Sequence, residues 1–254
     1  SEERFPMTNL ATPRFLLNGD TAVSAVFGDR ISEEVNQTIR AFQLLLTERK
    51  VPGIVETVPT YCSLMIHYDP DRISCDRLLG TLKELAASID TAALPPSEVL
   101  EIPVLYGGEM GPDLAHVAEN AGISEEEVVK RHSAPEYLIY MLGFTPGFTY
   151  LGGLDPSIET PRLKTPRVSI PAGSVGIAGK QTGIYPIASP GGWQLIGRTP
   201  VRMYDPLRET PILPRAGQYI HFFPITEEEY RKIEAEIEAG SYRLSTRKRE
   251  EVKA

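Results

Sequence analysis

The feature that most limits the fold of this chain is a change of sequence pattern near residue 136. From Glu136 to Ile225, glycine and proline recur every few residues, and no stretch keeps the spacing of an amphipathic helix. The pieces between them are short and prone to form strands. Many short strands separated by dense turn residues are typical of a closed β-barrel rather than an open sheet. We therefore expect a barrel in this part of the chain.

The first hundred residues have a different pattern, in which strand and helix signals alternate. A turn at Asn18-Gly19-Asp20 predicts a hairpin, and apolar residues at helical spacing predict helices over 32–50 and 74–89. Further strands are expected over 51–58, 61–68 and 99–105. The order β-α-β-β-α-β is typical of a ferredoxin-like sandwich. The local pattern assigns the strand over 99–105 to neither half of the chain.

Capping signals predict the remaining helices. Two short helices are expected over 113–121 and 124–132, and a last one begins at Thr226. Ser124 with Glu127, and Thr226 with Glu229, have the spacing of capping boxes. The predicted organisation is an α+β chain. It has an α/β domain over residues 1–95, a β-barrel domain over 96–225, and a C-terminal helix with a loose charged tail over 226–254.

Composition excludes several functions. The net charge of −8 argues against nucleic-acid binding, which requires a basic face, and no run of about 18 apolar residues could span a membrane. Two cysteines, Cys62 and Cys75, are too few for a disulfide framework and indicate a reducing compartment. The four histidines are far apart, so no metal site is expected. These features predict a cytoplasmic protein.

The segment from Gly173 to Thr182 is rich in glycine but lacks a known catalytic motif. A phosphate-binding loop is not predicted, because Ser174 stands where its first glycine belongs and Gln181 replaces its hydroxyl residue. No other cofactor motif is present. The context of Ser174 resembles a nucleophile elbow, but that elbow leads from a strand into a helix, and both flanks here are β-like. A turn or ligand-binding serine is the favoured interpretation.

Several segments of the barrel half combine rigid backbone with chemically useful side chains. Glycine allows a ligand to approach the backbone closely, and loops held by proline can present aromatic, amide, hydroxyl and cationic groups to a small polar ligand or a protein partner. The alternative is that glycine and proline only turn the corners of a barrel. The candidate binding residues are Phe144, Pro146, Gly147, Phe148, Tyr150, Arg162, Lys164, Arg167, Ser174, Gln181, Thr182, Tyr185 and Trp193.

His132 ends a predicted helix just before the barrel begins. The C-terminus of a helix favours the imidazolium form, so one interpretation is a helix cap and the other is a substrate or acid–base role. With Arg167 and Tyr185, His132 completes the set of candidate catalytic residues.

Four segments in this order carry a family resemblance: GFTPGFTYLGGLD, KTPR, IPAGSVGIAGKQTGIYPIASPGGW and LIGRTPVRMYDP. Together they are similar to the family formed by the B-type subunits of 5-oxoprolinase (PxpB), also called KipI-type or allophanate hydrolase subunit 1 proteins. The resemblance runs from about Phe15 to Ile225. It implies a small α/β N-terminal domain followed by a cyclophilin-like β-barrel.

The resemblance also implies a function. Family members act with two partners, a homologous C-type subunit (KipA-like) and a third, A-type subunit, and the complex uses ATP to open 5-oxo-L-proline to L-glutamate. This chain would then be a non-autonomous subunit whose substrate site a partner completes. Relatives suggest two alternatives, namely inhibition of histidine kinase autophosphorylation and a subunit of a related amide or urea hydrolase.

On this interpretation the candidate residues divide by role. Arg162, Lys164 and Arg167 would contact an anion or the substrate carboxylate. Gln181, Thr182 and Tyr185 would contact the ring amide, and Phe144, Phe148 and Trp193 would shape the pocket.

Overall fold

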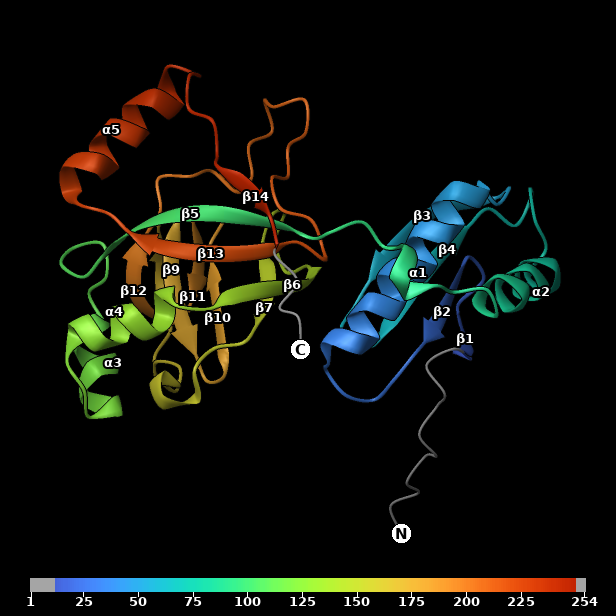
Figure 1. The fold of residues 1–254 in the computed structure, drawn as a ribbon, viewed down its shortest axis with the longest axis horizontal. Coiled ribbons are helices and arrows are strands. Elements are labelled where there is room, and N and C mark those ends of the chain that lie inside the picture. The colour runs from blue at the N-terminus through green and yellow to red at the C-terminus, as the bar shows by residue number, and fades with distance from the viewer. Residues whose placement is uncertain (1–11, 250–254) are drawn as a thin grey trace, which may run out of the picture. The chain divides into compact units, whose positions relative to one another are not determined.

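The computed structural model describes residues 12–249. The chain divides into two compact units between Pro95 and Pro96, and Figure 1 shows the elements of both. The N-terminal unit contains β1 (Arg14–Asn18), β2 (Ala22–Val26), α1 (Glu33–Arg49), β3 (Ile54–Pro59), β4 (Ser63–Tyr68), α2 (Cys75–Ala86) and the short 3₁₀ helix η1 (Thr91–Ala93).

The C-terminal unit holds the remaining elements. They are β5 (Glu98–Tyr106), α3 (Leu114–Ala121), α4 (Glu125–Ser133), β6 (Glu136–Leu142), β7 (Thr149–Gly152), η2 (Pro156–Ile158), β8 (Arg167–Ile170), β9 (Ser174–Ala178), β10 (Gln181–Ile184), β11 (Ser189–Gly191), β12 (Gln194–Arg198), β13 (Tyr219–Pro224), α5 (Glu227–Glu238) and β14 (Thr246–Lys248).

The N-terminal unit is a four-stranded antiparallel sheet, in the order β1-β2-β4-β3, with a core shared by α1 and α2. Alternate residues of β4 are buried, as the period-two pattern predicted, and Ser32 and Ser74 accept hydrogen bonds at the N-termini of the two helices. The predicted hairpin, strands and helices of this half are therefore confirmed.

The predicted order of this unit is corrected at both ends. The described elements run β-β-α-β-β-α, because the hairpin strand β1 extends the sheet beside β2. The expected last strand, β5, lies in the other unit, where it pairs in parallel with β13. A parallel partner more than a hundred residues away leaves no local signal, which is why the sequence pattern assigned this strand to neither half.

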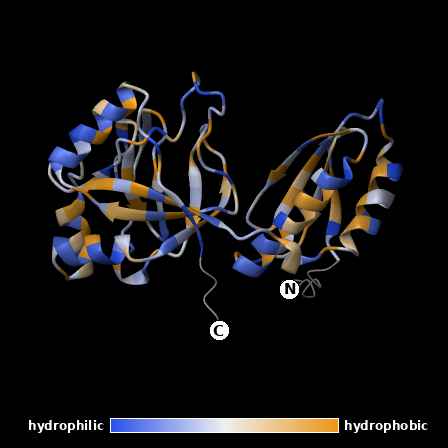
Figure 2. Cartoon of the chain, turned by 45° about the horizontal axis from the view of Figure 1, so that its top comes forward, coloured by the Kyte–Doolittle hydropathy of each residue, from blue (hydrophilic) through white to orange (hydrophobic). Residues whose placement is uncertain are grey.

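The C-terminal unit is built on an eight-stranded sheet. Seven of its strands follow the order β10-β9-β12-β5-β13-β6-β7, and β14 pairs with β5. The end strands β10 and β7 contact each other, so the sheet forms a nearly closed barrel. In Figure 2 the strands are mainly hydrophobic, whereas the helices are hydrophilic over part of their surface. The main core fills the barrel and extends under α3 and α4.

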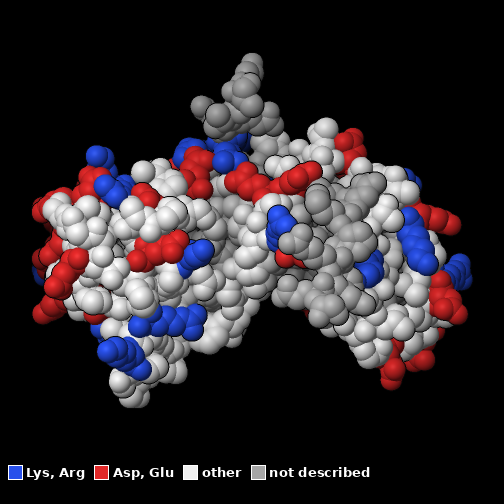
Figure 3. Space-filling model, turned by 90° about the horizontal axis from the view of Figure 1, so that it is seen from below, with Lys and Arg blue, Asp and Glu red and all other residues white. Residues whose placement is uncertain are grey.

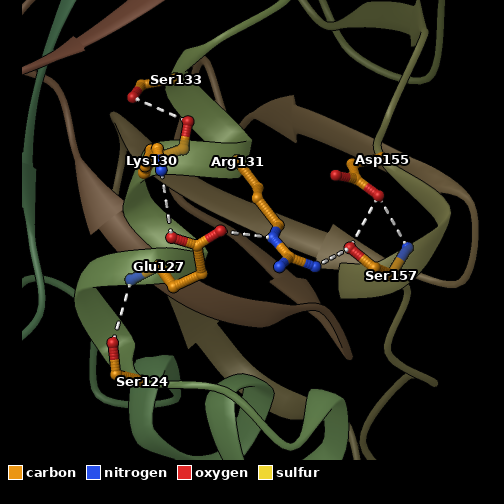
Figure 4. Close-up of polar contacts among 7 residues, drawn as sticks. All are labelled: Ser124, Glu127, Lys130, Arg131, Ser133, Asp155 and Ser157. Atoms are coloured by element: carbon orange, nitrogen blue, oxygen red, sulfur yellow. Dashed lines mark hydrogen bonds and ion pairs between the residues drawn. The ribbon is translucent and has the colours of Figure 1, made fainter.

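One arginine ties helix α4 to η2, the short 3₁₀ helix between β7 and β8. Arg131 donates to Glu127 (2.9 Å) and to Ser157 (2.7 Å), as Figure 4 shows. Ser124 accepts the backbone N–H of Glu127, but the Glu127 carboxylate pairs with Arg131 and Lys130. The predicted capping box at this helix is therefore only half formed, because a stronger charged partner competes for the glutamate.

The C-terminal segment contains more structure than expected. The capping box of Thr226 and Glu229 is complete at α5. Part of the tail that was expected to be loose forms β14, whose Arg247 bonds both Glu101 and Glu136 at 2.6 Å. Arg249 adds a 3.0 Å contact to Glu136 and lies over the ring of Tyr219. Ion pairs with the barrel thus order a segment that has little apolar surface.

Candidate functional site

The C-terminal unit contains a cavity of about 400 Å³ beside the small β8–β11 sheet. Its lining consists of aromatic side chains, turn residues, one cation and one amide. The lining residues are Phe144, Phe148, Tyr150, Arg162, Leu163, Pro166, Gln181, Tyr185, Pro190, Gly191, Gly192 and Trp193. They come from segments spread over fifty residues of sequence, which the barrel gathers in one place.

The aromatic wall is centred on Phe148. Its ring makes edge-to-face contacts with Phe144 (5.5 Å between centroids), Tyr150 (5.3 Å), Tyr185 (6.1 Å) and Trp193 (5.7 Å). Tyr185 and Trp193 also contact each other at 5.9 Å. Each such pair contributes about 0.5–1.5 kcal/mol beyond area burial. The wall is therefore preformed, and it is suited to a small flat ligand.

Two backbone features shape the cavity. A Cβ atom on Gly191 would lie 2.4 Å from the Tyr185 hydroxyl, so only glycine lets the chain pass this close to the phenol. Phe144 has a φ of 63°, a left-handed conformation that is rare for a bulky residue, and its side chain is 65% exposed at the rim. The loop thus holds an exposed aromatic ring over the cavity at a conformational cost.

Arg162, Gln181 and Tyr185 give the cavity its polar character. Burial raises the pKa of Tyr185, although the charge of Arg162 and a hydrogen bond from the Trp193 backbone oppose the shift. Tyr185 is therefore a neutral O–H donor at physiological pH. Arg162 is exposed, and none of the ion pairs among residues 12–249 involves it. It can therefore receive an anionic group of a ligand.

The lining residues include no Ser, Thr, Cys, His, Lys, Asp or Glu. Nucleophiles, general bases and general acids are drawn mostly from these types, and tyrosine is a further one. In the part of the chain that the structure describes, no group of three or more His, Cys, Asp or Glu residues could hold a metal ion. The cavity can bind and orient a small polar molecule, and among its lining side chains Tyr150 and Tyr185 are the ones of a type that serves in proton transfer.

Arg167, predicted to contact substrate, lies behind the cavity. It donates to Asp113 (2.8 Å) and to the Trp193 carbonyl (3.2 Å). Asp113 in turn accepts the backbone N–H of Leu195 at 2.6 Å. Sequence reasoning missed Asp113, because an aspartate directly before a helix is usually an N-cap. In the structure the Asp113 side chain makes no capping hydrogen bond. Together Arg167 and Asp113 hold the segment that carries Trp193.

His132, another of the three candidate catalytic residues, is fully buried and lies outside the cavity lining. Tyr106 and Thr182 lie 2.7 Å from its Nδ1 and Nε2 atoms, and the Thr182 hydroxyl donates to the Gly176 carbonyl. Nε2 therefore carries the proton, and Nδ1 accepts from Tyr106. Burial lowers the pKa of His132 to about 3. The interpretation of His132 as a charged helix cap is wrong, because the ring is neutral.

The other predicted residues fall into two groups. The cavity brings together Phe144, Phe148, Tyr150, Arg162, Gln181, Tyr185 and Trp193. Thr182 and Ser174 are buried inside the barrel, Lys164 is exposed outside the lining, and Pro146 and Gly147 line a shallower hollow beside Ile212.

Sequence reasoning missed Leu163, Pro166, Pro190, Gly191 and Gly192 as lining residues. In a sequence, the Pro and Gly residues among them indicate only that the chain turns, as it does at the corners of a barrel.

The charged side chains on the surface are of both signs (Figure 3). On the face shown in Figure 3, Lys and Arg side chains are interspersed with Asp and Glu. No helix among residues 12–249 is both long and apolar enough to cross a membrane.

Known proteins resemble this chain in both sequence and fold. Residues 13–214 match the family model described as carboxyltransferase domain, subdomain C and D. The B-type subunit of 5-oxoprolinase from Bacillus subtilis (strain 168) is 44% identical over 228 residues, which cover 86% of this chain and 95% of that protein.

Solved structures give the same result. A crystal structure of TTHA0988 is 42% identical with a TM-score of 0.71 over 81% of this chain, and the match spans 40% of its length. The K. lactis urea amidolyase is 21% identical with a TM-score of 0.73, over 96% of this chain and 17% of that protein, which is a likeness of fold alone. The family model matches residues 13–214, and the Bacillus subtilis protein is 44% identical over most of both chains. The chain therefore belongs to the PxpB family of carboxyltransferase-domain proteins, the B-type subunits of 5-oxoprolinase.

Proposed function

We propose that this chain is a non-autonomous subunit of an ATP-dependent 5-oxoprolinase complex. The complex would convert 5-oxo-L-proline, ATP and water to L-glutamate, ADP and phosphate. The aromatic cavity would bind the substrate, a homologous KipA-like partner would complete the site, and an A-type subunit would be the third component. The observation that carries this proposal is a preformed polar-rimmed aromatic cavity whose lining contains no Ser, Thr, Cys, His, Lys, Asp or Glu.

The groups in the cavity suit a lactam that bears a carboxylate. Arg162 can pair with the carboxylate by charge-assisted hydrogen bonds. The Tyr185 hydroxyl can donate to the lactam oxygen, where negative charge develops as the amide is attacked. The aromatic rings can cover the faces of the five-membered ring and exclude water. Each of these roles positions or polarises the substrate, and none transfers a proton.

The energetic problem of the reaction explains the requirement for ATP. An unstrained lactam resists water because amide resonance must be lost. Transfer of a phosphoryl group to the amide oxygen would turn that oxygen into a leaving group, and such a transfer depends on well-placed cations and donors. Such groups beyond Arg162 would come from the partners. The relatives support this division, since the chain spans only about two-fifths of TTHA0988, where the same fold is part of a longer chain.

We also propose a known fold type for each of the two units. The nearly closed barrel over 96–225 is taken as cyclophilin-like. The N-terminal unit, over residues 1–95, is taken as a ferredoxin-like variant, in which β1 occupies the edge beside β2 that the last strand of a β-α-β-β-α-β sandwich would fill.

Reconstitution tests the proposed function. Glutamate and phosphate release from 5-oxo-L-proline and ATP is measured with this chain alone, with the two partners alone, and with all three. We expect release only in the complete mixture. Release by the partners without this chain would contradict the proposal, and so would a complete mixture that acts on urea-type amides but leaves 5-oxoproline intact.

A further inference from the structure

A second cavity, in the N-terminal unit, is lined by three arginines. It has a volume of about 300 Å³ and shares no residue with the aromatic cavity. Its lining residues are Arg49, Val51, Pro52, Arg72, Ile73, Arg77, Thr81 and Leu85. We call it the arginine pocket.

Three segments of the chain build the arginine pocket. Arg49 lies in the last turn of α1, and Arg72 lies in the loop between β4 and α2. Arg77, Thr81 and Leu85 follow one another at four-residue intervals on α2, so they share one face of that helix. The helices and the sheet thus bring three cations from distant positions to one small cavity.

The charge of the arginine pocket is uncompensated. No Asp or Glu lines it, and none of the ion pairs among residues 12–249 involves Arg49, Arg72 or Arg77. In the other unit, by contrast, Arg131 and Arg247 each bind a carboxylate. In the whole chain acidic residues outnumber basic ones, 34 to 26. A cavity lined by three arginines and no acidic residue therefore has a charge opposite to the net charge of the chain.

The position of Arg77 at the start of α2 also indicates an anion site. It lies in the first turn of α2, where the helix dipole disfavours a cation by about 0.3–1 kcal/mol. Helix stability therefore does not account for this residue. An anion bound in the cavity would remove the penalty and pair with the guanidinium.

The floor of the arginine pocket is rigid. Gly53 has a φ of 87°, and a Cβ atom there would lie 2.4 Å from Cγ2 of the buried Ile73. The Gly53 carbonyl also accepts the N–H of Asp69 at 2.8 Å. The turn at 51–53 is thereby fixed against the loop that carries Arg72. A preformed cavity lowers the entropy cost of binding a small ligand.

We propose that the arginine pocket binds a small phosphate-bearing molecule. The phosphate oxygens would accept hydrogen bonds from Arg49, Arg72 and Arg77, and the remainder of the ligand would lie on Val51, Ile73 and Leu85. A phosphate offers enough oxygens for three guanidinium groups, whereas a carboxylate is satisfied by one bidentate arginine. This site is separate from the proposed substrate cavity and does not depend on the 5-oxoprolinase function.

Calorimetric titration of the full chain with inorganic phosphate, ribose 5-phosphate, ADP and succinate tests the proposal. We expect saturable binding of at least one phosphate compound and weaker binding of succinate. Arg77→Gln should weaken that binding about tenfold or more, since it removes a charge-assisted contact. Lys83→Gln, an exposed cation on α2 outside the lining, is the matched control and should leave it unchanged.

The ranking of the probes identifies the source of the phosphate. Equal affinity for all three phosphate compounds would assign the site to free phosphate, whereas a preference for the ester or for ADP would assign it to a metabolite or a nucleotide. Absence of saturable binding would overturn the proposal. Equal loss in Arg77→Gln and Lys83→Gln, or succinate binding as tight as phosphate binding, would also overturn it.

Discussion

At the scale of single residues, His132 is a buried group outside the aromatic cavity whose pKa is far from its usual value. Tyr106, His132, Thr182 and the Gly176 carbonyl form a directed chain of hydrogen bonds inside the barrel. The ring also stacks on Phe222 at 4.7 Å. A neutral imidazole satisfies every member of this chain, whereas a protonated one would place two donors where one acceptor is needed.

This arrangement predicts a pH-dependent stability. The pKa of His132 is about 3 in the folded protein, below the value of 6.5 for an unperturbed histidine, so the unfolded chain takes up the proton first. The contribution of the neutral, buried His132 to the free energy of unfolding is complete above pH 6.5 and falls as the pH drops toward 3. Between pH 7.5 and 5.0 the loss amounts to about 2 kcal/mol. Urea unfolding of the wild type and of His132→Gln at both pH values measures it.

The variant should lose this part of the pH dependence, whatever its stability at pH 7.5. His116→Gln, which changes an exposed histidine, is the control and should keep the wild-type dependence. If His132→Gln and the wild type lose the same amount of stability between the two pH values, His132 is not buried in its neutral form.

Phe144 gives a second prediction at this scale. Its φ of 63° suits glycine, and any other residue there is strained by roughly 1–2 kcal/mol. Phe144→Gly and Phe144→Ala both remove the ring, but only glycine removes the strain. We expect the glycine variant to have a free energy of unfolding about 1 kcal/mol higher than the alanine variant, after glycine's own entropy cost. Equal stabilities in urea would show that the loop does not hold this conformation.

At the scale of elements, the pairing of Arg167 with Asp113 joins β8 to the residue before α3 and supports Trp193. Both side chains are largely buried, with exposures of 29% and 13%. Arg167→Gln should lower the free energy of unfolding by about 1–3 kcal/mol, because it leaves the Asp113 carboxylate without its cation. Arg202→Gln removes a side chain that is 54% exposed and lies 3.8 Å from Asp205, and it should change the free energy of unfolding by less than about 0.5 kcal/mol.

A double-mutant cycle separates the pair from its surroundings. Asp113→Asn combined with Arg167→Gln should cost less than the sum of the two single variants by about 1 kcal/mol. Trp193 is the single tryptophan of the chain, so its fluorescence reports directly on the wall that Arg167 supports. Additive stabilities together with an unchanged emission spectrum would show that Arg167 does not position Trp193.

The sequence predicts elements well where the signal is local. The turn residues at Asn18–Asp20, the N-caps Ser32 and Ser74, and the change of pattern near 136 all correspond to observed features. It predicts poorly where a distant partner decides the outcome. Strand β5 joins the barrel by pairing with β13, and β14 is held by the ion pairs of Arg247 with Glu101 and Glu136.

The same distinction applies to the candidate site. Aromatic and glycine-rich segments identified Phe148, Tyr185 and Trp193 as residues that meet in one cavity. They did not show that Arg167 faces Asp113, because the two are 54 residues apart, nor that His132 faces inward. Residue type indicates what a side chain can do, and the direction in which it points depends on packing.

At the scale of the whole molecule, the two units carry different sites. The C-terminal unit holds a preformed aromatic cavity with Arg162 at its rim, and the N-terminal unit holds the arginine pocket. The lining of the aromatic cavity contains no Ser, Thr, Cys, His, Lys, Asp or Glu, so in the proposed function the partners supply the reacting groups beyond Arg162 and Tyr185. A histidine kinase as a further partner stays a prediction.

The most direct test of this account is the KM for 5-oxo-L-proline of the complete complex that carries Arg162→Gln. Lys180→Gln, an exposed cation one residue before β10 and outside the cavity, is the matched control. We predict a KM increase on the order of tenfold or more for Arg162→Gln, since the substrate carboxylate loses a charge-assisted partner, and an unchanged KM for Lys180→Gln. A wild-type KM in both variants would contradict the assignment of this cavity as the substrate site.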